Sequence, residues 1–378
     1  MPARKVLIAG ASGLVGHAAA DHFCQEGWEV VGVSRRRPDD LDAKASLLSV
    51  DLLDAAACER AFGGLGDVTH LVYAALQEIP GLMPGWLDPE LIERNALMLR
   101  NLFEPLARAS AGLEHVSLLH GTKAYGIHHP SIGPAGAKIP LREREPRREH
   151  PNFYFLQEDY LRERQAGGTW GLTVFRPTVI YGDAPGNNMN PIPAIGAYAA
   201  LLREEGQPLH FPGRPGAPAL REAVDADLVA HALTWAATAP AATGETFNLT
   251  NGDVFMWENV WPAIAETLGM EPGESRPISL TEELPKRDRE WAAIVEKHGL
   301  RAPSSILDFV GYNSLVYTDN VLGSPNRPPL PILNSTIKAR QAGFHECMDT
   351  EDMFRKWFAG LQAAGTLPSG SALPTSGD

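Results

Sequence analysis

The chain has 378 residues, of which 44% are hydrophobic and 21% are charged, so a large folded core can form without disulfide or metal staples. Its 33 basic and 46 acidic residues give a formal net charge of −13, which disfavours binding to nucleic acid or to an anionic membrane surface. The three cysteines lack CxxC spacing, no apolar run is long enough for a membrane-spanning helix, and the N-terminus carries no signal-peptide pattern. We therefore expect a cytoplasmic protein with reduced thiols and no membrane contact.

Strand and helix patterns alternate along the first half of the chain. Short apolar runs predict six strands, at 6–9, 29–33, 47–51, 68–74, 115–119 and 172–180. Helical spacing predicts helices between them, at 14–26, 91–108 and 154–165. This alternation is typical of βαβ units, in which helices cover both faces of a parallel sheet.

The second half is patterned less clearly because proline-rich pieces interrupt it. Helices are predicted at 225–237 and 260–268, and the segment 130–150, which alternates Arg with Glu, is predicted to be a solvated loop. The fold class is therefore α/β: a Rossmann-like, doubly wound parallel sheet with a smaller α-rich C-terminal substrate lobe. We expect residues 1–185 and about 213–252 in the dinucleotide domain, 186–212 and 253–362 in the lobe, and a disordered tail at 363–378.

A glycine-rich turn follows the first predicted strand and opens the first helix. Its glycines have G-x-x-G-x-x-G spacing, which suits a tight turn, a close approach to pyrophosphate and close packing of helix on strand. The free N–H groups at the helix N-terminus favour an anion. A dinucleotide is therefore expected to contact Gly10, Ser12, Gly13, Leu14, Val15 and Gly16.

The end of the second predicted strand favours NADP(H) over NAD(H). Ser34, Arg35 and Arg36 stand where NAD enzymes often place a ribose-binding carboxylate, and guanidinium groups pair well with a 2′-phosphate. Further cofactor contacts are expected at the carboxyl ends of later strands, where open α/β sheets bind ligands. These are Asp51 and Leu52 beside the adenine, Ala74 and Pro177, and Val179 and Ile180, whose backbone groups would hold the carboxamide.

The catalytic pattern departs from that of ordinary short-chain dehydrogenases. None of the eight tyrosines has a lysine four residues later, so Tyr-x-x-x-Lys is absent. Two other segments, HGTKAYG at 120–126 and NFYFLQED at 152–159, resemble motifs of the progesterone 5β-reductase/iridoid synthase-like (PRISE) family of atypical extended short-chain dehydrogenases/reductases. Further similar segments occur in the same order at 95–102, 175–190, 247–261 and 335–344.

The resemblance implies that Tyr154 and Lys123 are the catalytic pair and that Tyr154 also contacts the cofactor. The family uses NADPH to reduce the C=C bond of enones or enals, with hydride reaching the β-carbon and charge developing on the carbonyl oxygen. The lysine is expected to lower the pKa of the tyrosine and to stabilise that oxyanion. The chain departs from the family pattern at Ala124 and Phe155, and at His120, for which a structural role is favoured over an extra donor role.

Several points stay open at this stage. The substrate pocket is expected to include Phe153, Asn187, Met189, Phe309 and Tyr312, but the natural enone or enal and the proton donor to the α-carbon are not determined. Alternatives on the same fold are a carbonyl reductase, a hydroxysteroid dehydrogenase or a sugar epimerase, and a non-catalytic NADP sensor. No metal site is predicted, and the oligomeric state stays open, with a homodimer as the default.

Overall fold

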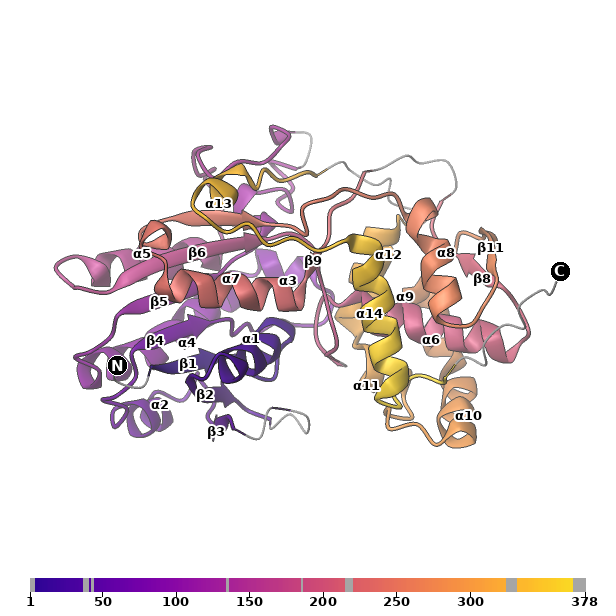
Figure 1. The fold of residues 1–378 in the computed structure, drawn as a ribbon, viewed down its shortest axis with the longest axis horizontal. Helices are drawn as coiled ribbons and strands as arrows, with labels where there is room; N and C mark the ends of the chain where they lie inside the picture. The colour runs from indigo at the N-terminus through magenta and orange to yellow at the C-terminus, as the bar shows by residue number, and fades with distance from the viewer. Residues whose placement is uncertain are drawn as a thin grey trace.

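The computed structural model describes residues 4–36, 41, 44–133, 136–184, 186–214, 220–323 and 332–369. A parallel sheet with flanking helices forms one part of the molecule, on the left in Figure 1, and a helical lobe forms the other. None of the helices within these ranges is both long and apolar enough to cross a membrane.

The sheet has seven parallel strands in the order β10-β6-β5-β4-β1-β2-β3. All six predicted strands are confirmed, although the last is divided at residues 178–179 into β6 and a short β7 (Ile180–Tyr181) that pairs with β9 (Val224–Asp225). The prediction missed β10, a four-residue edge strand whose Phe247 pairs with Phe175 of β6. The sheet consists of β1 (Lys5–Ala9), β2 (Glu29–Ser34), β3 (Ser46–Ser49), β4 (His70–Tyr73), β5 (His115–Leu119), β6 (Gly171–Pro177) and β10 (Thr246–Leu249).

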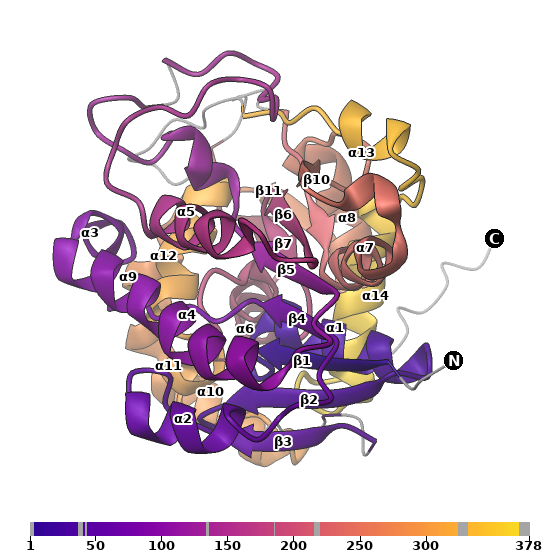
Figure 2. The same ribbon diagram turned by 90° about the vertical axis from the view of Figure 1, so that its left-hand side faces the viewer.

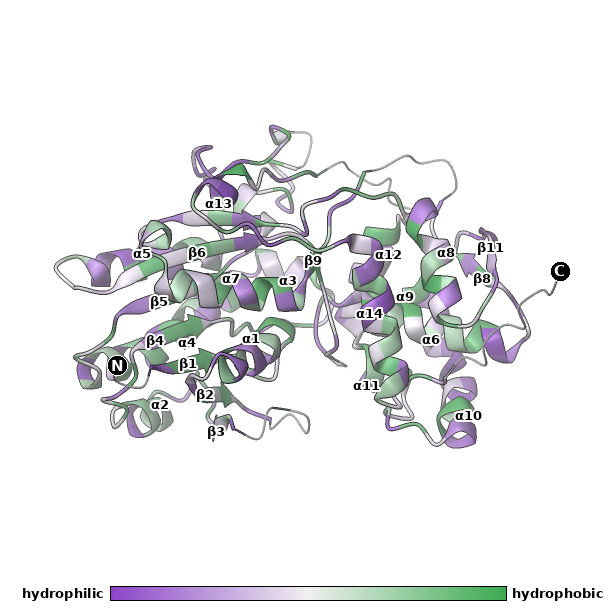
Figure 3. Ribbon diagram, viewed as in Figure 1, coloured by the Kyte–Doolittle hydropathy of each residue, from purple (hydrophilic) through white to green (hydrophobic). Residues whose placement is uncertain are grey.

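Helices cover both faces of the sheet, as Figure 2 shows. Val6 and Ile8 of β1 pack in a core with α1 (Leu14–Gln25) and α7 (Ala226–Thr238), whereas Leu7 and Ala9 pack on the other face. That opposite layer contains α2 (Ala55–Phe62), α4 (Pro89–Ala109) and α5 (Phe153–Gln165). Burial on both faces explains why β1 is an uninterrupted apolar run, and the central strands are coloured as hydrophobic in Figure 3.

The lobe is mainly helical and packs around its own apolar core. The predicted helix at 260–268 is confirmed as α8, whose Trp257 and Trp261 are buried. The α-rich character of the lobe is confirmed as well, with a small parallel pair of β8 (Leu209–Phe211) and β11 (Pro272–Ser275). Its helices are α6 (Pro191–Glu204), α8 (Trp257–Thr267), α9 (Leu280–Glu283), α10 (Asp288–His298), α11 (Ile306–Val310), α12 (Tyr312–Leu322) and α14 (Thr350–Ala363).

Two expectations about the second half need correction. The helix α13 (Ile337–Gln341), which the sequence placed in the lobe, lies beside β10, and Phe344 shares a core with Phe247. The segment 136–150 is not simply solvated, because Leu141 is buried and Arg147 forms ion pairs with Glu158 and Asp159. Long-range packing, which a local charge pattern does not encode, decides both placements.

The expectation of a disordered tail from residue 363 is also wrong for its first part. Arg301 donates a backbone hydrogen bond to the carbonyl of Gly365 at 2.8 Å, and Leu367 is 1% exposed and packs over Gly196 of α6. Residues 370–378 lie outside the described residues. Burial of Leu367 and Pro368 and the hydrogen bond to Gly365 together fix the chain after α14.

Replacing Leu367 by Ala is expected to lower the free energy of unfolding by about 2–5 kcal/mol, because it opens a cavity in the lobe core. Urea unfolding followed by far-UV circular dichroism measures this change. The matched control is Leu307→Ala on α11, where the side chain is 42% exposed and the same change should cost less than about 0.5 kcal/mol. Equal effects of the two substitutions would contradict the packed position of Leu367.

Candidate active site

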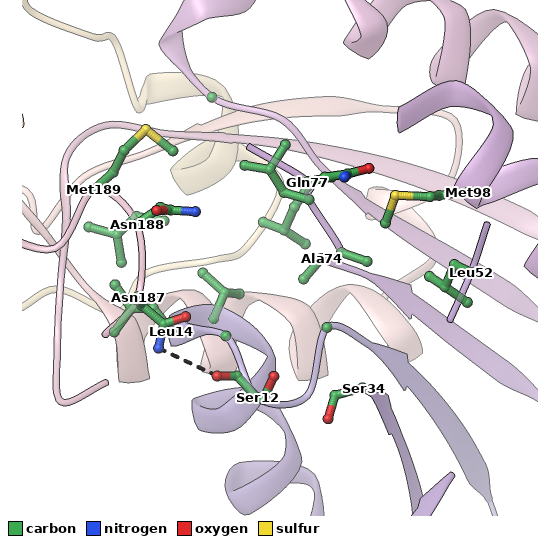
Figure 4. A pocket seen from close by; sticks show the side chains of 18 of the residues that line it. Ser12, Leu14, Ser34, Leu52, Ala74, Gln77, Met98, Asn187, Asn188 and Met189 are labelled. Carbon is green, nitrogen blue, oxygen red and sulfur yellow. Dashed lines mark hydrogen bonds between the residues drawn. The ribbon is translucent and has the colours of Figure 1, made fainter. Parts of the chain in front are cut away.

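The candidate site is a cavity of about 320 Å³ at the carboxyl ends of the parallel strands. Loops that follow β1, β2, β4, β5 and β6 line it from the sheet, and Asn187, Met189 and Tyr317 line it from the lobe. Figure 4 shows the loop at Asn187–Met189 facing the turn that contains Ser12. The site therefore lies between the two parts of the molecule, at the position where open α/β sheets bind ligands.

The glycine-rich turn has the tight geometry that a dinucleotide requires. Gly10 has φ +88°, and a Cβ on it would lie 2.8 Å from the carbonyl oxygen of Ala74. A Cβ on Gly16 would lie 2.1 Å from the carbonyl oxygen of Gly10. Gly16 does not line the cavity; its lack of a side chain lets helix α1 pack close to the strand. These two positions permit only glycine, and the backbone of the turn is left open to the cavity.

The side chains expected around the adenosine end gather at one end of the cavity. Ser34, Arg35 and Arg36 after β2 line it together with Asp51 and Leu52 after β3. Both arginines are exposed, and the Ser34 hydroxyl donates to the carbonyl of Arg36. The third arginine of this turn, Arg37, lies outside the described residues.

One asparagine joins the loops that carry the predicted catalytic pair. Asn152 is the N-cap of α5, and its side-chain oxygen accepts from the backbone N–H of Tyr154 at 3.0 Å. Its side-chain nitrogen donates to the carbonyl of Lys123 at 3.2 Å. The cap therefore fixes Tyr154 in the first turn of the helix and holds the Lys123 loop beside it. A Cβ on Gly121 would lie 3.3 Å from the Tyr154 hydroxyl, so this glycine leaves room for the phenol.

Lys123 is half-buried in a mixed apolar and sulfur environment. Its Nζ lies 4.0 Å from the centre of the Trp86 ring and donates to Sδ of Met189 at 3.1 Å. Burial lowers the pKa of Lys123 to about 8, while the nearby Glu78 carboxylate opposes that shift. The ammonium is therefore present at neutral pH and is lost as the pH rises above about 8.

Tyr154 differs from the expectation in its ionisation. Burial raises its pKa, and Glu78 and Tyr317 raise it further, so Lys123 does not activate the phenol toward ionisation as the sequence argument expected. Tyr154 is only 7% exposed, and the desolvation of a phenolate at this position is the main cause of the shift. The hydroxyl stays protonated at neutral pH and can act as a hydrogen-bond donor.

His120 stacks against the Tyr154 phenol. Its ring stacks on Tyr154 with centroids 4.4 Å apart and planes 16° apart, and its Nδ1 lies 4.0 Å from Glu158. Burial holds the pKa of His120 well below its usual value, and Arg176 and Arg147 contribute in the same direction. Neither ring nitrogen meets strict hydrogen-bond geometry with a described residue, although a hydrogen bond with the Tyr154 backbone opposes the lowering of the His120 pKa, so the structural role of His120 stays a prediction.

The structure brings most, but not all, of the predicted site residues together. Phe309 is fully buried in the lobe core and stacks on Trp291, Tyr312 is 45% exposed, and neither lines the cavity. Val179 packs against the lobe core instead of facing the cavity. The predicted residues that do line it are Gly10, Ser12, Gly13, Leu14, Val15, Ser34, Arg35, Arg36, Asp51, Leu52, Ala74, Lys123, Phe153, Tyr154, Pro177, Ile180, Asn187 and Met189.

Sequence reasoning also missed several residues of the site. Met98 lines the cavity from α4, and its place in the NALMLRNL segment was a usable signal. Gln77 lines it after β4, and Tyr317 reaches it from the lobe, where no local motif marks it. Trp86 lies behind the cavity wall in an apolar cluster with Phe153 and Tyr154.

The fold and the site together define an extended short-chain dehydrogenase/reductase. UDP-glucose 4-epimerase from Thermus thermophilus, solved in complex with NAD, superposes with a TM-score of 0.65 over 95% of this chain and 99% of that chain. UDP-glucose 4-epimerase from Thermotoga maritima gives a TM-score of 0.66 over 95% and 99% of the two chains. Their identities of 19% and 16% establish a shared fold and not a shared reaction.

The chain belongs to the family of the PRISE-like Rossmann-fold domain, whose model matches residues 70–368. The (S)-8-oxocitronellyl enol synthase ISY1 of Nepeta cataria is 33% identical over 96% of this chain and 92% of its own. The 3-oxo-Delta(4,5)-steroid 5-beta-reductase of Arabidopsis thaliana is 31% identical over the same shares. The family resemblance inferred from the sequence motifs is therefore confirmed.

Proposed function

We propose that this protein is an NADPH-dependent reductase that acts on the activated C=C bond of an enone or enal. The observation that carries the proposal is the juxtaposition, through Asn152, of a protonated phenol and a half-buried ammonium in the wall of one cavity. The same cavity contains the glycine turn and the two arginines at its other end. Relatives named as an enol synthase and a steroid 5β-reductase support this reaction class.

The residues present fit a phosphorylated dinucleotide. The positive φ of Gly10 and the close approach at Gly16 leave the backbone of the turn open for a pyrophosphate, and the arginine pair suits a 2′-phosphate. When bound, the cofactor supplies the hydride that reduces the C=C bond. Pro177 and Ile180 line the same cavity, where they would contact the nicotinamide end.

The chain's own residues would stabilise the charge that develops on the substrate oxygen. The Tyr154 hydroxyl donates to that oxygen, and the Lys123 ammonium favours the negative charge electrostatically. Tyr154 is buried and Lys123 is half-buried, so a local dielectric below that of water strengthens their effect on the enolate. Phe153, Leu76 and Met189 provide apolar walls that fit an uncharged substrate body.

A protonated phenol favours donation over base catalysis and therefore favours C=C reduction over hydride removal from an alcohol. The deciding experiment incubates the protein with NADPH and either 2-cyclohexen-1-one or cyclohexanone and identifies the products by gas chromatography. We expect cyclohexanone from the enone and no turnover of the ketone. Allylic alcohol, or cyclohexanol from the ketone, would establish a carbonyl reductase instead. NADPH binding without turnover across a panel of enones and enals would support a sensor.

A further inference from the structure

A second pair of side chains, Glu78 and Trp86, stands behind the catalytic lysine. Glu78 follows β4 and Trp86 belongs to α3 (Met83–Leu87), so neither comes from the segments that carry Tyr154 and Lys123. The Trp86 indole N–H donates to Glu78 Oε1 at 3.0 Å, and the face of its ring lies 4.0 Å from Lys123 Nζ. Trp86 is 3% exposed and also contacts the Tyr154 ring edge-on, with centroids 5.2 Å apart.

This arrangement suits the holding of a buried cation. The face of an indole ring attracts an ammonium, and the attraction is strongest where water is excluded. A carboxylate that accepts the indole N–H orients the ring and adds negative charge on the same side of the site. Glu78 Oε2 is buried and accepts no hydrogen bond from the described residues. Burial raises the pKa of Glu78, while the Lys123 ammonium and the Trp86 N–H favour its carboxylate form.

We propose that Glu78 and Trp86 are positioning residues for the proposed reduction: Trp86 holds the Lys123 ammonium at the cavity wall, and Glu78 orients Trp86 and keeps that ammonium protonated. The inference rests on the proposed function because it assigns these residues a role in stabilising the enolate. Neither residue lines the cavity that contains the catalytic pair, so both act through Lys123.

The charge of Glu78 has a defined consequence for the pH dependence of the reaction. The pKa of Lys123 is about 8 with the carboxylate present, and removal of that negative charge lowers the pKa further. Since the ammonium form is the active one, activity should then fall at a lower pH on the alkaline side. The other titratable groups around Lys123 are uncharged at neutral pH. Burial raises the pKa of Tyr154 and Tyr317 and lowers the pKa of His120, His150 and His128, that of His128 to about 3.

The test compares Glu78→Gln with wild type by measuring kcat against pH on 2-cyclohexen-1-one. The glutamine oxygen can still accept from Trp86, so the geometry is kept while the charge is lost. We expect the alkaline limb of the kcat–pH profile to shift to lower pH by about one unit. The matched control is Glu93→Gln, the same change at an exposed position of α4, which should leave the limb in place. An unchanged limb in Glu78→Gln would overturn the proposal.

A second measurement separates this inference from the proposed function. NMR titration of ¹⁵N-labelled lysine side chains, assigned with Lys123→Arg, reports the pKa of Lys123 without turnover. A lower value in Glu78→Gln supports the pairing even if no enone is reduced. An unchanged value in a protein that does reduce enones contradicts the pairing alone.

Variants of Trp86 test the role of the ring. Trp86→Phe keeps an aromatic face and should retain kcat within about threefold, whereas Trp86→Leu should lose roughly tenfold or more. Equal kcat values for the two variants would show that the aromatic face does not position Lys123. If Trp86→Leu fails to fold, the pH profile of Trp86→Phe still tests the proposal, because phenylalanine has no N–H to donate to Glu78. An alkaline limb of that profile identical to wild type would contradict the role of Glu78 in orienting the ring.

Discussion

Replacing Tyr154 by Phe is expected to reduce kcat for an enone by about 10²–10³-fold, which is the effect of removing one oxyanion donor. The hydroxyl is the atom that would meet the substrate oxygen, and Phe keeps the ring contacts with His120 and Trp86. Steady-state kinetics measures the loss, and fluorescence titration should show NADPH affinity close to wild type.

The matched control for this change is Tyr160→Phe on the same helix. Tyr160 donates to Glu104 outside the cavity, so the same loss of a hydroxyl there should leave kcat within about twofold. Turnover of Tyr154→Phe near the wild-type value would show that the phenol is not the donor. The Lys123 ammonium or a water molecule would then hold the developing charge.

Replacing Arg35 and Arg36 together by Ala is expected to weaken NADPH binding by about 10–100-fold and to change NADH binding little. A hydrogen bond to a charged group contributes about 1.5–3 kcal/mol to binding. Because both guanidinium groups are exposed, we expect the loss of the pair to cost a binding free energy toward the lower end of that range. Fluorescence titration with each nucleotide gives the two Kd values.

Salt and charge effects are controlled with Arg94→Ala, which removes an exposed arginine that pairs with Glu90 on α4, away from the cavity. This variant should bind both nucleotides as wild type does. Equal weakening of NADPH and NADH by the double variant would contradict a 2′-phosphate site and leave a general electrostatic attraction as the explanation. A ratio that moves toward NADH would support NADPH as the natural cofactor.

Local patterns determined the sheet and one side of the site. The apolar run of β1 is followed at once by the glycine turn and helix α1, so contiguous residues specify the whole strand–turn–helix unit. Arg35 and Arg36 follow β2 in the same way, at the edge where parallel strands end. These features were predictable because each depends on neighbours in sequence and on the 2.0 and 3.6 residue periods.

Contacts between distant segments decided the rest. The edge strand β10 is only four residues long and is identified by its pairing with β6, and Leu367 is buried by α6 although it lies in a polar stretch. Phe309 and Tyr312 were expected in the pocket, but they lie in the lobe core and on its surface. Lobe packing instead brings Tyr317 to the cavity.

By itself, the sequence determined the family, the α/β class and the glycine turn, and it predicted Tyr154 and Lys123 as the catalytic pair. The tertiary structure alone decided that Asn152 joins their loops, that Glu78 and Trp86 stand behind Lys123, and that Tyr154 remains protonated. The physical reason is that ionisation follows burial and the charges nearby in space, and both arise only when segments far apart in the chain pack together.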